Sequence, residues 1–158
     1  MKKKEKTNNC GFSLVELVIV IAIMAVLVGI VGTQVIPYID KARKAKDIQI
    51  VNGYCTDAAT AFTSCTDQLD TSKSYTITLT KGSTNWTVDA MDSSGADNTV
   101  LRNSFVELNG LNTDYPNFQS NEGKKINKIK IVCKHGNFVT KLTVEGPTDA
   151  SAFTVETK

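Results

Sequence analysis

With 158 residues, the chain is long enough for one modest domain, and its formal net charge of +2 suggests a mildly basic protein. The charge is unevenly placed, because residues 1–11 hold four lysines and one glutamate, a balance of +3 that leaves −1 for the remainder. Lysines beside an apolar segment are typical of the cytoplasmic side of a membrane span. Because the excess positive charge is confined to this N-terminal tip, the net charge of the chain is no evidence for nucleic-acid binding.

A long apolar segment follows the basic tip. Residues 12–36 contain Glu16 as their only ionisable side chain, and roughly 20 apolar residues suffice to cross a bilayer as a helix. A secretory signal has a shorter apolar core, roughly 7 to 15 residues, followed by a small-residue cleavage site. No such site follows Ile36, so the segment is predicted to be a membrane-spanning helix.

Glu16 is out of place in this apolar setting. A carboxylate within the apolar layer costs about 2.5 to 3.5 kcal/mol on insertion scales unless it finds a partner. One interpretation is that the side chain extends to the membrane interface. The other is that a cut between Gly11 and Phe12 creates a cationic amine about one helical turn away, which pairs with the carboxylate.

Residues 11–16, Gly-Phe-Ser-Leu-Val-Glu, resemble the class III signal of type IV prepilins and pseudopilins, with a basic leader before them and an apolar helix after them. The resemblance implies that prepilin peptidase cleaves between Gly11 and Phe12 and methylates the new amino terminus of Phe12. It further implies that Glu16 pairs with the Phe12 amine of a neighbouring subunit. The short leader and the Phe after the cut are closer to type IVa pilins and pseudopilins than to type IVb pilins.

The apolar segment departs from the family pattern at its middle. Many members carry a proline there, where the helix loosens during assembly, whereas this chain has Gly29, Gly32 and Thr33 and its first proline is Pro37. A glycine weakens a helix by about 1 kcal/mol relative to alanine. Loosening at the glycines and a kink at Pro37 near the membrane surface are the two alternatives.

The sequence from Tyr38 to about Cys65 predicts the second, amphipathic half of the same helix, which is expected to run unbroken from Phe12. Apolar residues recur there at steps of three and four, which forms one stripe on a helix. The stripe consists of Ile48, Val51, Cys55, Ala58, Phe62 and Cys65. The charged residues before the stripe are Asp40, Lys41, Arg43, Lys44, Lys46 and Asp47. The cluster 41–46 can face anionic lipid headgroups, acidic residues on adjacent subunits, or only water.

The composition after Thr66 changes to Thr, Ser, Asn, Asp and Gly with short alternating runs, which predicts a small antiparallel sheet. The expected hairpins pair residues 75–80 with 86–90 and residues 126–134 with 138–145. Residues 152–156 are expected to form an edge strand, and residues 100–108 a short helix with Asn98 as its cap and Gly110 as its stop.

These elements predict an α+β fold, in which a long N-terminal α-helix packs on a small antiparallel β-sheet in the manner of type IV pilins. The predicted parts are a cleaved basic leader (1–11), a transmembrane or filament-core half of the helix (12–36), an amphipathic half (37–66) and a globular head (67–158).

Three cysteines remain once the leader and Cys10 are removed, namely Cys55, Cys65 and Cys133. Cys55 and Cys65 would lie about 15 Å apart along a continuous helix, and a disulfide needs alpha carbons within about 7 Å. They cannot bridge each other unless the helix ends between them. One of them can bridge to Cys133 in an oxidising space, or all three can remain buried thiols.

No catalytic or cofactor site is indicated by the sequence. The single histidine, His135, falls in a predicted tight turn, and the chain has no phosphate-binding glycine loop, no G-x-S-x-G sequence and no Cys-x-x-Cys pair. No enzyme activity, cofactor or metal site is therefore expected. Lysines crowd the second hairpin and could meet nucleic acid or an acidic surface, but a lysine row is more typical of the wet face of a sheet.

The function expected from the resemblance is a structural subunit of a type IV pilus-like filament, for adhesion, twitching motility or DNA uptake. Its partners would be other pilin subunits, prepilin peptidase and a membrane assembly platform. It would lie in the cytoplasmic membrane before assembly and in an extracellular filament afterwards. Two alternatives stay open: a pseudopilin of a type II secretion or competence system, and a singly anchored surface protein that binds a ligand.

Overall fold

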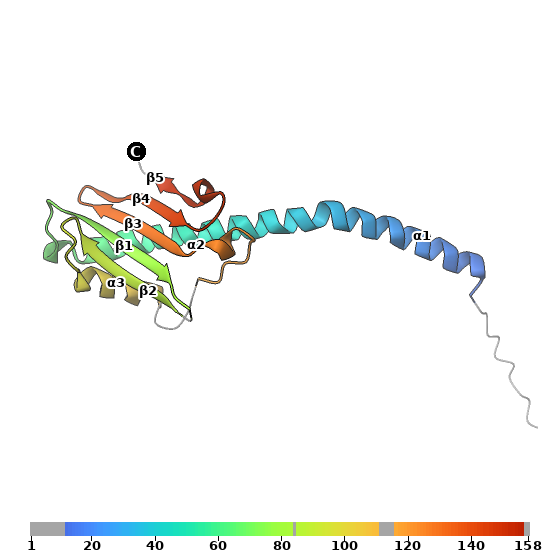
Figure 1. Cartoon of the computed structure of the whole chain (residues 1–158), viewed down its shortest axis with the longest axis horizontal. Coiled ribbons are helices and arrows are strands. Elements are labelled where there is room, and N and C mark those ends of the chain that lie inside the picture. Colours follow the sequence, from blue (N-terminus) through green and yellow to red (C-terminus); the bar gives the residue numbers. More distant parts are fainter. Residues whose placement is uncertain (1–11, 84, 111–115, 157–158) are drawn as a thin grey trace, which may run out of the picture. The chain divides into compact units, whose positions relative to one another are not determined.

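The computed structural model describes residues 12–83, 85–110 and 116–156 (Figure 1). The chain divides into two compact units, one that ends at Ile39 and one that begins at Asp40 and that we call the head. The leader with Gly11 lies outside the described residues, so the predicted cleavage junction is described only on its Phe12 side.

Three consecutive helical elements begin in the N-terminal unit and continue along the chain into the head. Helix α1 comprises Leu14–Ile30, a π-helical turn η1 comprises Val31–Val35, and helix α2 comprises Ile36–Ser64. Helical backbone therefore continues in sequence from Leu14 to Ser64, which confirms the predicted long helix. By length and composition this helix could cross a membrane.

The π-helical turn η1 contains Gly32 and ends two residues before Pro37, the first proline. Pro37 has no N–H to donate to the carbonyl of Thr33, four residues earlier, and its ring crowds that carbonyl. The backbone widens instead, and the N–H of Ile36 bonds to the carbonyl of Val31, five residues back. The Thr33 hydroxyl donates to the carbonyl of Gly29 at 3.0 Å. The helix thus loosens in the stretch that contains Gly32 and immediately precedes Pro37.

The head contains one antiparallel sheet in the order β2-β1-β3-β4-β5. Its strands are β1 (Ser74–Lys81), β2 (Trp86–Asp92), β3 (Lys128–Lys134), β4 (Asn137–Glu145) and β5 (Val155–Glu156). Both predicted hairpins, β1–β2 and β3–β4, are present. In β3 the buried Ile129, Ile131 and Cys133 alternate with partly or fully exposed residues, as the sequence predicted.

Three short 3-10 helices and one α-helix complete the head: η2 (Thr66–Gln68), α3 (Thr99–Asn109), η3 (Gly123–Lys125) and η4 (Ala150–Phe153). The predicted cap and stop of α3 are confirmed, because the Asn98 side chain accepts from the N–H of Leu101 and Gly110 has a φ of 58°. The predicted edge strand over 152–156 is wrong in its first half. Phe153 is buried in η4, and the strand is reduced to β5.

The core of the head lies between α2 and the sheet, one face of which α2 covers in Figure 1. The predicted stripe supplies the helix side, since Val51, Ala58, Phe62 and Cys65 are buried and Ile48 and Cys55 pack partly buried against the core. Aromatic rings join the elements: Phe62 contacts Tyr75 of β1, and Tyr54 contacts Phe105 of α3, with centroids 5.9 and 6.4 Å apart.

Candidate assembly site

The first turn of α1 is closed by a reciprocal cap. Ser13 has extended backbone angles, and its hydroxyl accepts a hydrogen bond from the N–H of Val15 at 3.4 Å. In return, the Glu16 carboxylate accepts from the N–H of Ser13 at 2.9 Å. This capping box satisfies backbone donors that a helix leaves free at its start.

The cap holds the Glu16 carboxylate beside the residue that follows Phe12. A negative charge at this end of a helix is also favoured by the helix dipole. Among the described residues, no cation pairs with Glu16, and Phe12 is 87% exposed. The structure therefore leaves the carboxylate next to the point where cleavage would create an amine, with capacity for a further partner.

The surface of α1 is apolar on all sides. Every residue of α1 is described, and none of its side chains is buried within the chain. A helix that is apolar all round needs lipid or other helices around it. Outside contacts must therefore cover α1, either in a bilayer or among other subunits.

Asp47 was assigned to the charged cluster before the stripe, and that assignment is wrong, because its side chain is fully buried. Its carboxylate accepts from the N–H groups of Gln119 and Ser120 at 2.9 and 2.8 Å and from the Ser120 hydroxyl at 2.6 Å. The Ser120 hydroxyl in turn accepts from the N–H of Gly123, whose Cα leaves no room for a side chain against Asp47. This arrangement, which we call the Asp47 anchor, ties residues 119–123 to α2.

Among the basic residues of the charged cluster, one contacts other parts of the head and three are exposed. Lys44 forms an ion pair with Asp149 at 3.0 Å and lies 5.8 Å from the centre of the Phe153 ring. Lys41, Arg43 and Lys46 are exposed. Of the basic residues in this cluster, these three have exposed side chains that are available for contacts outside the chain.

The three cysteines contribute to the same core. Cys65 and Cys133 are buried and Cys55 is half-buried, and all three are thiols in the structure. Burial, together with the nearby thiols of Cys55 and Cys65, raises the pKa of Cys133 to about 12. Both helix cysteines thus lie close enough to Cys133 to interact with it electrostatically, but a neutral buried thiol is a poor nucleophile. The predicted disulfide stays a prediction.

The remaining candidates from the sequence give no reactive site. His135 is exposed in the β3–β4 turn, and among the described residues no group of His, Cys, Asp and Glu could hold a metal ion. The lysine row is partly neutralised, because Lys128 and Lys130 both pair with Glu145, at 3.7 and 2.7 Å.

These features define a chain with an exposed apolar helix that carries one acid in its first turn. Residues 6–32 match the family model for the prokaryotic N-terminal methylation motif. This motif is the class III signal of type IV pilins and pseudopilins, a structural family that prepilin peptidase processes. Over these residues the chain is therefore similar to the N-terminal segment of type IV pilins and pseudopilins. No curated protein and no solved structure matches the chain.

Proposed function

We propose that the chain is a pilin, a structural subunit of a type IV pilus-like filament that serves adhesion, twitching motility or DNA uptake. The observation that carries this proposal is the capped Glu16 at the start of a wholly exposed apolar helix, inside a matching methylation motif. Such a helix needs neighbours that cover its apolar surface, and other copies of the same helix can provide this cover.

The proposed sequence of events assigns a role to each predicted part. Prepilin peptidase removes residues 1–11 at the Gly11-Phe12 junction and methylates Phe12. The segment 12–36 then holds the subunit in the cytoplasmic membrane until an assembly platform transfers it to the extracellular filament. There Glu16 pairs with the Phe12 amine of a neighbour, which neutralises a carboxylate that is costly in an apolar environment. The amphipathic half (37–66) carries the globular part, residues 67–158, on the filament surface.

The same signal occurs in pseudopilins of secretion and competence systems. The preference for a pilin rests on the well-packed head, whose core unites α2, α3 and five strands. Surface filaments that are lost on deletion of this chain, seen by electron microscopy, are expected for a pilin. Intact surface filaments together with a secretion or DNA-uptake defect would favour the pseudopilin instead.

The central test separates the charge of Glu16 from its role as a helix cap. Glu16→Ala removes both, whereas Glu16→Gln keeps a side chain that can accept from the N–H of Ser13 but carries no charge. Ser13→Ala is the matched control, since it weakens the cap and leaves the charge. Both Glu16 variants are expected to insert in the membrane and to lose the leader, yet to fall at least about tenfold in filament yield, a cost of about 1.4 kcal/mol. Wild-type filament yield from Glu16→Gln would eliminate the charge-pairing mechanism.

The cysteines support a second part of the proposal, a disulfide between Cys133 and one of the two helix cysteines, Cys55 or Cys65. In an oxidising compartment such a bond would cross-link β3 to α2 through Cys55, or through Cys65 to the residue that follows α2. Peptide mapping of surface material without reductant is expected to find Cys133 linked to one of them and the other thiol free. Recovery of all three cysteines as free thiols would contradict this pairing.

A further inference from the structure

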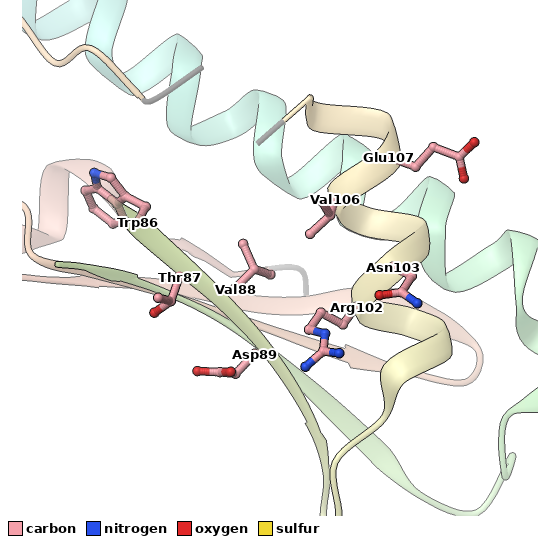
Figure 2. Close-up of a pocket in the computed structure, with 8 residues that line it drawn as sticks. All are labelled: Trp86, Thr87, Val88, Asp89, Arg102, Asn103, Val106 and Glu107. Carbon is pink, nitrogen blue, oxygen red and sulfur yellow. The ribbon is translucent and has the colours of Figure 1, made fainter. Parts of the chain in front are cut away.

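The head has a groove between strand β2 and helix α3. It has a volume of about 580 Å³ and is lined by Trp86, Thr87, Val88 and Asp89 of β2 and by Arg102, Asn103, Val106 and Glu107 of α3. Figure 2 shows Val88 and Val106 pointing toward each other from the two elements, with Trp86 at one end of the strand. The volume is in the range of ligand sites, but the lining is mostly polar.

The backbone of β2 is only partly paired on the groove side. Because β2 is the last strand in the order, β1 covers just one of its two edges. On the other edge, the Ala90 carbonyl accepts from the N–H of Asn98, and the N–H of Asp92 donates to the carbonyl of Ala96. Residues 96–98 therefore occupy the end of the edge nearest Asp92.

As far as the described residues show, the rest of this edge has no strand beside it and faces the groove. In an antiparallel strand, alternate residues direct both the N–H and the C=O to the same side. The backbone C=O of Ala90 points away from β1, so the backbone N–H and C=O groups of Val88 and Trp86 do so as well. Consistent with this, the N–H of Lys81, which lies opposite Trp86, bonds to the carbonyl of Asn127 and not to Trp86. Among the described residues, no backbone hydrogen bond on this side reaches Trp86 or Val88. Within the described ranges, Trp86 and Val88 thus present unpaired donors and acceptors beside α3.

The charge around the open edge favours a basic partner. Asp89 and Glu107 are exposed, and neither forms an ion pair or hydrogen bond with another described residue. Arg102 is offset by Asp97, whose carboxylate lies 3.8 Å from its guanidinium. The lining carboxylates Asp89 and Glu107 and the neighbouring Asp97 outnumber the single guanidinium of Arg102, so the groove and its rim have a net negative charge at neutral pH.

We propose that this groove binds an extended, lysine- or arginine-containing peptide segment of a partner protein, which adds as a short strand to the edge of β2. The backbone of Trp86 and Val88 pairs with the peptide, Val88 and Val106 contact its apolar side chains, and Asp89 and Glu107 attract its cations. The groove lies wholly within the head, so this proposal is independent of whether the chain forms filaments.

The chain contains a single tryptophan, Trp86, which makes its fluorescence a direct probe of the groove. The full-length chain in detergent micelles is titrated with the blocked peptide Thr-Lys-Val-Lys-Thr and with its acidic counterpart Thr-Glu-Val-Glu-Thr. We expect a saturable change in emission with the lysine peptide and none with the glutamate peptide. Equal binding of both peptides, or of neither, would overturn the proposal.

Strand addition makes a specific prediction for N-methylated peptides. Only alternate amides of the added strand face β2, so methylation of one alternate set should abolish binding and methylation of the other set should leave it intact. If both N-methylated forms bind like the parent peptide, the contact does not involve the strand edge and the proposal fails.

Variants of the chain test the two sources of affinity separately. Val88→Pro removes the outward N–H without breaking the pairing with β1, which an edge strand tolerates, and should abolish binding while the head stays folded. Asp89→Asn and Glu107→Gln should each weaken binding about two- to fivefold at low salt, whereas the exposed Asp67→Asn on η2 should not. Trp86 emission that depends on chain concentration and ignores the peptide would assign the groove to a second copy, and this too would overturn the proposal.

Discussion

Two carboxylates on the same helical stretch, Glu16 and Asp47, have opposite surroundings. Glu16 is exposed in the first turn of α1, where its described partner is one backbone N–H. Asp47 is fully buried in α2 and accepts three hydrogen bonds, all from residues of its own chain. The head therefore satisfies its buried acid internally, whereas the N-terminal unit presents an acid and an apolar surface that other molecules must cover.

This difference separates folding from assembly. A buried polar group contributes to stability only when its hydrogen bonds are complete, and Asp47 meets that condition without any partner molecule. The exposed apolar side chains of α1 contribute nothing to a core of this chain. Substitutions at Asp47 should thus act on the stability of the head, and substitutions at Glu16 on association between subunits.

The largest expected effect on stability is that of Asp47→Ala. The change leaves the N–H and the hydroxyl of Ser120 buried without their acceptor and removes the acceptor of the part-buried N–H of Gln119, so the free energy of unfolding should fall on the order of 3 kcal/mol. Denaturant titration of the full-length chain in micelles, followed by Trp86 emission, measures this loss. Asp67→Ala, at an exposed position, is the control and should change the free energy by less than about 0.5 kcal/mol. Equal, small effects of the two variants would show that the Asp47 anchor does not stabilise the head.

A smaller effect is expected from acid. The ammonium groups of Lys73, Lys125 and Lys130 hold the pKa of Asp92, Glu122 and Glu145 below the usual range for carboxyl groups. A carboxyl group whose pKa is lower in the folded state stabilises the fold above its unfolded pKa, about 4, and that contribution is lost as the pH falls. The denaturation midpoint of the head should therefore decrease between about pH 5 and pH 2.

The strongest of these pairs, Lys73 and Asp92 at 2.6 Å, offers the control. Asp92→Asn should flatten the dependence of the midpoint on pH, because the group that titrates has been removed. A midpoint that rises on acidification, or an unchanged slope in Asp92→Asn, would contradict this assignment.

The smallest effect is that of Lys44→Met. This change removes the ion pair with Asp149 and the contact of the ammonium with the Phe153 ring, and should cost about 0.5 to 1 kcal/mol. Lys41→Met is the matched control, because Lys41 is exposed. If both variants have the same stability as the parent chain, the contacts of Lys44 with Asp149 and Phe153 do not stabilise the head, and the prediction is contradicted.

Much of the fold could be predicted from local patterns. The three-and-four spacing of apolar residues predicted the buried face of α2, and strict alternation predicted which side chains of β3 are buried. The strand expected at 152–156 was wrong over its first half, because alternation is weak over so few residues. A single large side chain, Phe153, gains more by entering the core in η4 than by extending an edge strand.

Of the functional features, the sequence identified Glu16 but neither the burial of Asp47 nor the groove at β2. Glu16 was identified because a charge in an apolar run is conspicuous, but Asp47 was missed because charged neighbours surround it in sequence. Its spacing did contain the signal, since Asp47 lies four residues before Val51 on the stripe. The groove at β2 could not be predicted, because the position of β2 at the edge and the placement of α3 depend on strand order and not on local sequence.

The most direct test of the proposed function is the intact mass of the chain recovered from the cell surface. The account predicts a single species that begins at Phe12 and carries one methyl group on its amino terminus, so that an amine is present for Glu16 to meet. A surface chain that still begins at Met1 or Lys2 would contradict it, because no amine would then exist at the start of the apolar helix.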